Sequence, residues 1–186
     1  MNALNRWGAA ASVLALGAVG AVVAGSVATA DNGSNDGAFT VTKRLGGYQE
    51  VPAVSTVASG SVRLRVDPAA GTIAYTVRYA GLEGAVQQSH IHFGSRTDAG
   101  AISAFLCSNL GNGPAGTPTC PADNPGEVSG TLTAASGTDR ASAQGIAAGE
   151  FSELVAAIRA DRTYVNVHSS KFPGGEVRGQ LPSHGH

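Results

Sequence analysis

An alternation of polar and apolar residues with a period of two constrains the fold of this chain more than any other feature. Residues 61–66 alternate in this way, and residues 72–79 repeat the pattern after a turn that contains Pro68 and Gly71. Successive side chains of a strand point to opposite faces, so each segment is typical of a strand with one buried face. Proline and glycine favour a tight turn. The two segments therefore predict an antiparallel β-hairpin.

Further segments are strand-like, and one is typical of a helix. Apolar residues at 151, 154, 155 and 158 follow the spacing of an amphipathic helix. We expect this short helix to pack against an edge or end of the sheets. The other predicted strands cover residues 39–45, 87–94, 99–107, 126–133, 163–169 and 176–181. The expected class is all-β, with a Greek-key-like antiparallel β-sandwich architecture and one short helix.

The N-terminal segment has the features of an export signal. Arg6 precedes an uncharged apolar run over residues 8–28, and Ala28-Thr29-Ala30 stands directly before Asp31. This order predicts a secretory signal peptide over residues 1–30 and a secreted or extracytoplasmic, cell-envelope location. The alternative is a retained membrane anchor, because the run approaches the ~20 residues that span a bilayer. Its many alanines and glycines, without a flanking basic cluster, favour cleavage.

Cleavage would leave residues 31–186, which suit one domain. We expect a polar linker at 31–37, a domain at 38–182 and a tail at 183–186. The formal net charge is −1 for the whole chain and becomes −2 when Arg6 is removed. Basic side chains are scattered, so no nucleic-acid binding is expected. The scarcity of lysine beside arginine, with abundant alanine and glycine, indicates a GC-rich bacterial genome.

The two cysteines predict a disulfide. An even cysteine count in an exported chain favours oxidation, and Cys107 and Cys120 flank a loop rich in proline and glycine. Closing this loop would stabilise the fold by ~3 kcal/mol in the loop-entropy model. The alternative, a pair of metal ligands, is disfavoured because neither cysteine has a second cysteine close to it.

Three histidines in strand-like segments form a candidate metal site. His90 and His92 share one face of their strand, and His168 shares a face with Asn166 on another. If the two strands are neighbours, three imidazoles converge, and imidazole is a good ligand for copper or zinc. Copper is the cofactor considered first. The alternative is that the histidines are incidental residues on a solvated strand face. His184 and His186, in the tail, are expected to be idle.

Several polar residues are candidates to surround these ligands. A histidine ligand usually donates its second N–H to a carboxylate or a carbonyl. Asp98, Glu176 and nearby backbone carbonyls are candidates for that role, and Asn166 lies close in sequence to His168. Glu176 and Arg178 share a face that we expect to be solvent-exposed, so they are predicted to form a surface ion pair, with a role near the histidines as the alternative.

The order of these motifs resembles the CHRD domain, which is found in chordin. Residues 45–52 (LGGYQEVP) resemble its opening motif, residues 89–92 and 164–168 its later landmarks, and residues 174–181 (GGEVRGQL) its closing motif. The similarity runs from about residue 39 to residue 181. The histidine pattern also resembles, more weakly, the copper ligands of copper–zinc superoxide dismutases, but the bridging histidine and the zinc ligands are missing between residues 93 and 167.

The leading hypothesis from the sequence is an exported binding or structural module that binds copper through His90, His92 and His168. One alternative is a copper redox enzyme with dismutase-like activity, in which Arg178 attracts an anionic substrate. The other is a structural cell-envelope domain without metal. Growth-factor binding is not expected, since the cysteine-rich modules that accompany the domain in chordin are absent from this sequence. An extracellular or envelope protein is the expected kind of partner.

Overall fold

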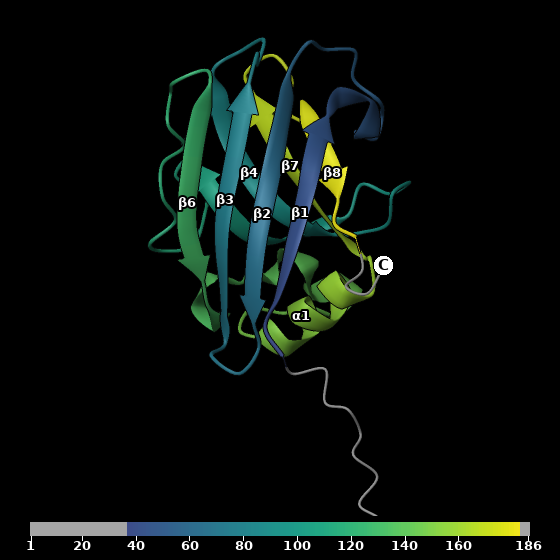
Figure 1. Ribbon diagram of the computed structural model, residues 1–186, viewed down its shortest axis with the longest axis vertical. Helices are drawn as coiled ribbons and strands as arrows, with labels where there is room; N and C mark the ends of the chain where they lie inside the picture. The colour runs from purple at the N-terminus through teal and green to yellow at the C-terminus, as the bar shows by residue number, and fades with distance from the viewer. Residues whose placement is uncertain (1–36, 183–186) are drawn as a thin grey trace, which may run out of the picture. The chain divides into compact units, whose positions relative to one another are not determined.

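The computed structural model describes residues 37–182, which form two β-layers packed face to face (Figure 1). All strand pairs are antiparallel and belong to one hydrogen-bonded sheet in the order β5-β4-β7-β8-β1-β2-β3-β6. The strands are β1 (Phe39–Gly46), β2 (Ser59–Asp67), β3 (Thr72–Ala80), β4 (Val86–Phe93), β5 (Ala101–Ser108), β6 (Gly126–Leu132), β7 (Thr163–Ser169) and β8 (Val177–Gln180). The predicted signal peptide, most of the linker and the tail lie outside the described residues.

The sheet bends between β8 and β1, where only Gly46 and Arg178 are paired. One layer therefore contains β6, β3, β2 and β1, and the other β5, β4, β7 and β8. Connections that cross between layers join β3 to β4, β5 to β6, and β6 to β7, as in Greek-key folds. The predicted all-β Greek-key-like sandwich is confirmed, and each of the eight predicted strands is present. The last strand is shorter than predicted, ending at Gln180.

The β2–β3 hairpin follows the predicted alternation. Leu64 pairs with Tyr75 and Val66 with Ile73, and all four side chains are buried against the other layer. Complete burial of an aliphatic side chain stabilises a fold by about 1.5–3 kcal/mol. The polar residues between them point outward, so the period-two pattern separates core from surface.

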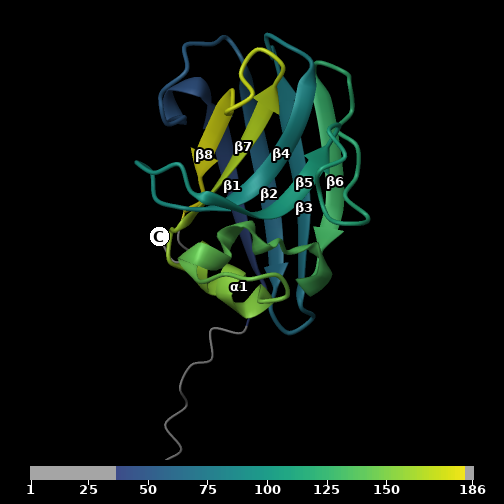
Figure 2. The same ribbon diagram turned by 180° about the vertical axis from the view of Figure 1, so that it is seen from behind.

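The predicted helix is confirmed as α1 (Phe151–Arg159). Leu154, Val155 and Ile158 are buried, and the helix closes one end of the sandwich (Figure 2). Three short 3-10 helices were not predicted, because segments this short have no apolar periodicity: η1 (Gly47–Gln49), η2 (Ala134–Ser136) and η3 (Asp139–Gln144). Among the described residues, no helix has the length and apolar character needed to cross a membrane.

Cys107 and Cys120 form a disulfide, as predicted. Cys107 lies at the end of β5, and Cys120 lies in the loop that leads to β6. The bond therefore fastens the long loop to the edge of the β5-β4-β7-β8 layer.

A tyrosine hydroxyl links the two layers. Tyr75 Oη on β3 donates a hydrogen bond of 2.7 Å to the Leu106 carbonyl oxygen on β5. We expect Tyr75→Phe to lower the free energy of unfolding by about 1–2 kcal/mol, because a buried carbonyl would lose its partner. Urea unfolding would measure this loss. Tyr48→Phe is the matched control, since Tyr48 is 81% exposed; equal losses in both variants would contradict the role of the link.

Candidate metal centre

The pairing of β4 with β7 brings the three histidines together. His90 lies opposite Asn166, and His92 lies opposite Tyr164. Residues directly opposite share a face of the sheet, so His168, two residues from Asn166, lies on that same face. One ring nitrogen from each histidine lies within 4.8 Å of the other two. The predicted convergence of the imidazoles is therefore present.

The histidines lie on the outer face of their layer but are shielded from solvent. Ile91, Val165 and Val167, which alternate with the site residues, belong to the hydrophobic core on the other face. His90 and His168 are nevertheless only 0% and 5% exposed, and His92 only 7%. The segments around Gly100 and Pro173 contact the rings directly, and Phe105 packs edge-to-face on His90 with centroids 4.4 Å apart. Loops thus cover the face that carries the site.

Backbone carbonyls hold two of the imidazoles in one orientation. His92 Nδ1 lies 2.8 Å from the Gly100 oxygen, and His168 Nδ1 lies 2.9 Å from the Pro173 oxygen. A carbonyl only accepts, so each Nδ1 carries the proton and each Nε2 keeps a free lone pair. The sequence offered Asp98, Glu176 and backbone carbonyls as acceptors for the second N–H of the histidines. In the structure, backbone carbonyls accept from His92 and His168.

Gly100 is required for one of these contacts. A Cβ atom at this position would stand 1.8 Å from the Phe93 oxygen, so no other residue fits without moving the backbone. The close approach places the Gly100 carbonyl oxygen against His92 Nδ1, and the same oxygen accepts a hydrogen bond of 3.3 Å from Tyr164 Oη.

Burial keeps the imidazoles neutral. Desolvation lowers the pKa of His92 to about 4, although the hydrogen bond to Gly100 acts in the opposite direction. Burial also lowers the pKa values of His90 and His168, and the other histidines of the cluster lower that of His90 further. Neutral imidazole is the form that binds metal, so the cluster is ready to ligate an ion at pH 7.

The spacing of the donor atoms fits a shared ion. Two ligands ~2 Å from one ion, at roughly 90–110° to each other, stand about 2.8–3.3 Å apart. His90 Nδ1 and His168 Nε2 are 3.1 Å apart. Two ligand atoms on opposite sides of one ion are at most ~4.2 Å apart. The nitrogens of the cluster lie within 4.8 Å of one another, so binding of an ion would draw the rings slightly together. Within residues 37–182, His92 Nε2 and His90 Nε2 are both buried without a hydrogen-bond partner, so each keeps a lone pair for a ligand.

The predicted surface position of Arg178 is wrong. Arg178 is 1% exposed, and its Nη1 and Nη2 donate to the carbonyl oxygens of Asp98 and Ser95 at 3.0 and 2.6 Å. Its guanidinium lies 3.4 Å from the centroid of the Tyr164 ring, which stacks in turn on His92 at 4.6 Å. Residues 95–98 cover this face and bury Arg178. Arg178 contacts the histidine cluster through Tyr164, because the Tyr164 ring lies between the guanidinium and His92.

Glu176 is also buried and does not pair with Arg178. Its Oε1 accepts hydrogen bonds of 2.9 Å from Thr56 Oγ1 and from the backbone N–H of Glu83. Its Oε2 has no hydrogen-bond partner among residues 37–182. Glu176 thus joins two loops at one end of the sandwich, and the predicted ion pair is replaced by contacts that the sequence pattern does not reveal.

Glu50 is a residue of the site that the sequence analysis missed. It is 7% exposed, and burial raises the pKa of its carboxyl to about 7, although nearby Arg178 and Asn166 act to lower it. Glu50 lies in the motif at residues 45–52, between β1 and β2. Nothing in that motif predicts that its carboxyl lies close to a residue of β7. Together with Arg178 it lines a pocket of about 230 Å³ beside the cluster.

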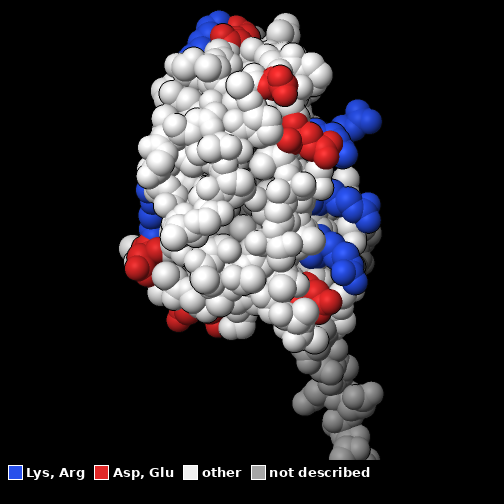
Figure 3. Space-filling view, turned by 90° about the vertical axis from the view of Figure 1, so that its left-hand side faces the viewer, with Lys and Arg blue, Asp and Glu red and all other residues white. Residues whose placement is uncertain are grey.

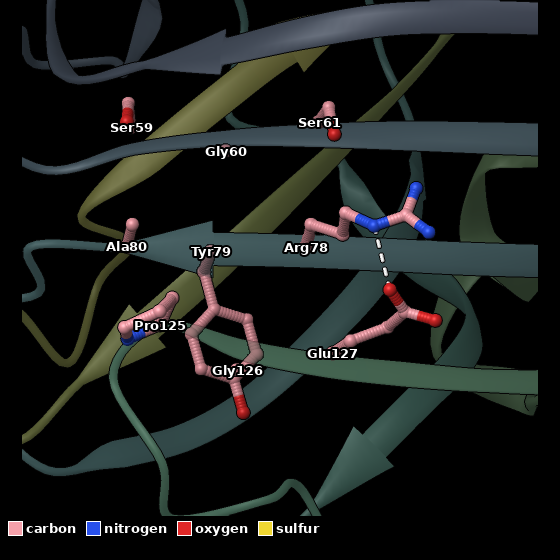
Figure 4. A pocket seen from close by; sticks show the side chains of 9 residues that line it. All are labelled: Ser59, Gly60, Ser61, Arg78, Tyr79, Ala80, Pro125, Gly126 and Glu127. Carbon is pink, nitrogen blue, oxygen red and sulfur yellow. Dashed lines mark ion pairs between the residues drawn. The ribbon is translucent and has the colours of Figure 1, made fainter.

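A second depression lies away from the histidines. It is a depression of about 510 Å³ on the outer side of β2, β3 and β6 (Figure 4). Its two charged residues, Arg78 and Glu127, form an ion pair of 2.6 Å, so they neutralise each other and offer little to a charged ligand. On the face shown in Figure 3, charged side chains lie around the rim, and no basic cluster occupies the middle.

Comparison with known families agrees with these features. The model of the CHRD domain matches residues 41–181, most of the chain. No curated protein and no solved structure matches significantly. The matched segment begins in β1 and ends directly after β8, so it includes all three histidines and the residues that contact them. This chain belongs to the CHRD domain family.

Proposed function

We propose that this CHRD domain is an extracytoplasmic module that binds one transition-metal ion through His90, His92 and His168. The observation that carries the proposal is a buried, neutral set of three imidazoles in which backbone carbonyls direct two Nε2 lone pairs inward. The disulfide and the apolar segment at residues 1–30 support export, because disulfides persist in oxidising compartments.

Copper is the first metal to test. A set of imidazole nitrogens suits copper and zinc, and the affinity of such sites for divalent ions peaks at Cu²⁺. When bound, copper would supply a redox-active centre, whereas zinc, which has no redox chemistry, would supply a structural or a Lewis-acid centre. The role of the chain itself is to present neutral nitrogens and to hold their rings in place by packing and by hydrogen bonds from Nδ1.

The burial of the rings favours binding over turnover. The three histidines are only 0–7% exposed, so a small substrate would need the covering loops to move to reach them. The dismutase-like alternative therefore receives less support than a binding role. Superoxide removal by loaded protein at a rate above that of free copper would reverse this order.

Metal analysis of the mature protein tests the proposal. After loading with Cu²⁺ and dialysis, we expect one tightly held ion per chain, and we expect His168→Gln to lose it. The matched control changes His184 and His186, in the tail, to glutamine and should retain the ion. Retention by His168→Gln, or its loss from the tail variant, would place the copper elsewhere and leave a domain whose histidines are only structural.

A further inference from the structure

Asn166 belongs to the histidine cluster by position. On β7 it lies opposite His90 on β4 and opposite Arg178 on β8, and it is only 2% exposed. Its Oδ1 is 2.9 Å from His168 Nε2, and its side chain lies close enough to His92 to act on that ring. The carboxamide therefore lies among the same nitrogens that would hold an ion.

Glu50 and the amide group of Asn166 lie on either side of Gly175. A Cβ atom at Gly175 would stand 2.4 Å from Glu50 Oε1 and 2.8 Å from Asn166 Nδ2, so both atoms border the same glycine. Gly175 also has a φ of 129°, which disfavours any other residue. Glu50 Oε1 has no hydrogen bond of ordinary length within residues 37–182. Asn166 Nδ2 thus lies on the side of Gly175 and Glu50, and Asn166 Oδ1 lies toward the histidines.

This orientation brings lone pairs together. His168 Nδ1 donates to the Pro173 oxygen, so His168 Nε2 and Asn166 Oδ1 are both acceptors at 2.9 Å. His92 Nε2 adds a further lone pair, because its Nδ1 donates to Gly100. His90 Nδ1 lies 3.1 Å from His168 Nε2, so a third imidazole nitrogen faces the same point. Two acceptors at this distance repel each other unless a cation lies beside both.

The distance of 2.9 Å between His168 Nε2 and Asn166 Oδ1 is typical of two ligands of one ion. A nitrogen at ~2.0 Å and an oxygen at ~2.2 Å from a metal, at a right angle, stand about 3.0 Å apart. We propose that Asn166 Oδ1 is a fourth ligand, beside the three imidazoles, and that it biases the site toward divalent ions over Cu⁺. This inference rests on the proposed function. An amide oxygen is a hard donor, whereas Cu⁺ prefers soft sulfur ligands.

In the alternative arrangement, the amide oxygen and nitrogen of Asn166 exchange positions. Nδ2 would then donate to His168 Nε2, and Oδ1 would accept a proton from a neutral Glu50. In that case Asn166 would compete with the ion for His168, and removing its side chain would strengthen metal binding. The two arrangements therefore predict opposite signs for one substitution.

The decisive variant is Asn166→Ala, compared with Asn166→Asp, which keeps an oxygen ligand. Affinities for Cu²⁺ and Cu⁺ would be measured by competition with chelating dyes, and the Cu²⁺ ligand set by electron paramagnetic resonance. We expect Asn166→Ala to weaken Cu²⁺ binding by at least ~10–100-fold, to change the copper hyperfine splitting, and to leave Cu⁺ binding unchanged. Asn166→Asp should restore Cu²⁺ binding.

Unchanged or tighter Cu²⁺ binding by Asn166→Ala, or an unchanged spectrum, would overturn the fourth ligand. His168→Gln separates this failure from that of the proposed function. If His168→Gln loses copper while Asn166→Ala behaves as wild type, the three-histidine site stands and only the ligand role of Asn166 is wrong. If His168→Gln also binds as wild type, both ideas are wrong. Circular dichroism of the metal-free variants would confirm that each is folded.

Discussion

Acidification from pH 7 to pH 4 is expected to lower the free energy of unfolding of the metal-free domain, because its buried histidines bind protons less readily than they do in the unfolded chain. Histidine titrates near pH 6.5 in an unfolded chain, but burial lowers the pKa of His92 to about 4 in the fold. A group with a lowered pKa stabilises the fold fully above pH 6.5, and this contribution disappears as the pH falls through 4. His92 alone accounts for ~3 kcal/mol, at ~1.4 kcal/mol for each pH unit. His90 and His168 act in the same direction.

Glu50 opposes this trend and provides the control. Burial raises the pKa of its carboxyl from 4.5 to about 7, so its protonation between pH 7 and 4.5 stabilises the fold by a comparable amount. Two further histidines tip the balance toward net loss. Urea unfolding of chelator-treated protein at four pH values would test this. Glu50→Gln should steepen the loss and His92→Gln should reduce it; a flat profile in the unsubstituted protein would contradict the neutral cluster.

Copper should stabilise the domain strongly through the same residues. An ion at 1,000 times its Kd, bound only by the folded state, raises the free energy of unfolding by ~4 kcal/mol. For a domain of this size that corresponds to an increase in Tm of roughly 10 °C. Differential scanning calorimetry at neutral pH, with and without Cu²⁺, would measure it.

His168→Gln should abolish this gain, whereas the variant with His184 and His186 changed to glutamine should keep it. A gain of the same size in His168→Gln would mean that copper stabilises the protein by contacts outside the cluster. The comparison is informative because the two variants remove imidazoles from different parts of the chain without changing its formal charge at neutral pH.

Local patterns were sufficient for most of the fold. The alternation in β2 and β3 and the apolar stripe of α1 arise from neighbouring residues, because side-chain direction in a strand or helix follows sequence spacing. The same rule placed His90 and His92 on one face. Their meeting with His168 depends on β4 pairing with β7, which the sequence allowed but did not determine.

What the sequence could not provide is the identity of the segments that cover the site. Arg178 lies on a strand face that is exposed in a bare sheet, and residues 95–98 make it buried. Glu50 reaches the site across a loop that precedes β2. Such contacts depend on how connections fold back over a sheet, and no spacing between residues encodes them. The motif at residues 45–52 marks Glu50 as a member of the family pattern, but it does not indicate its neighbours.

The two faces of β4 and β7 have different roles. Ile91, Val165 and Val167 pack into the sandwich, while the imidazoles and Asn166 occupy the reverse side. Exchanging a ligand for a side chain of similar size therefore opens no void between the layers. We therefore expect the scaffold to accept a different donor set of similar size, which would allow its metal selectivity to be engineered.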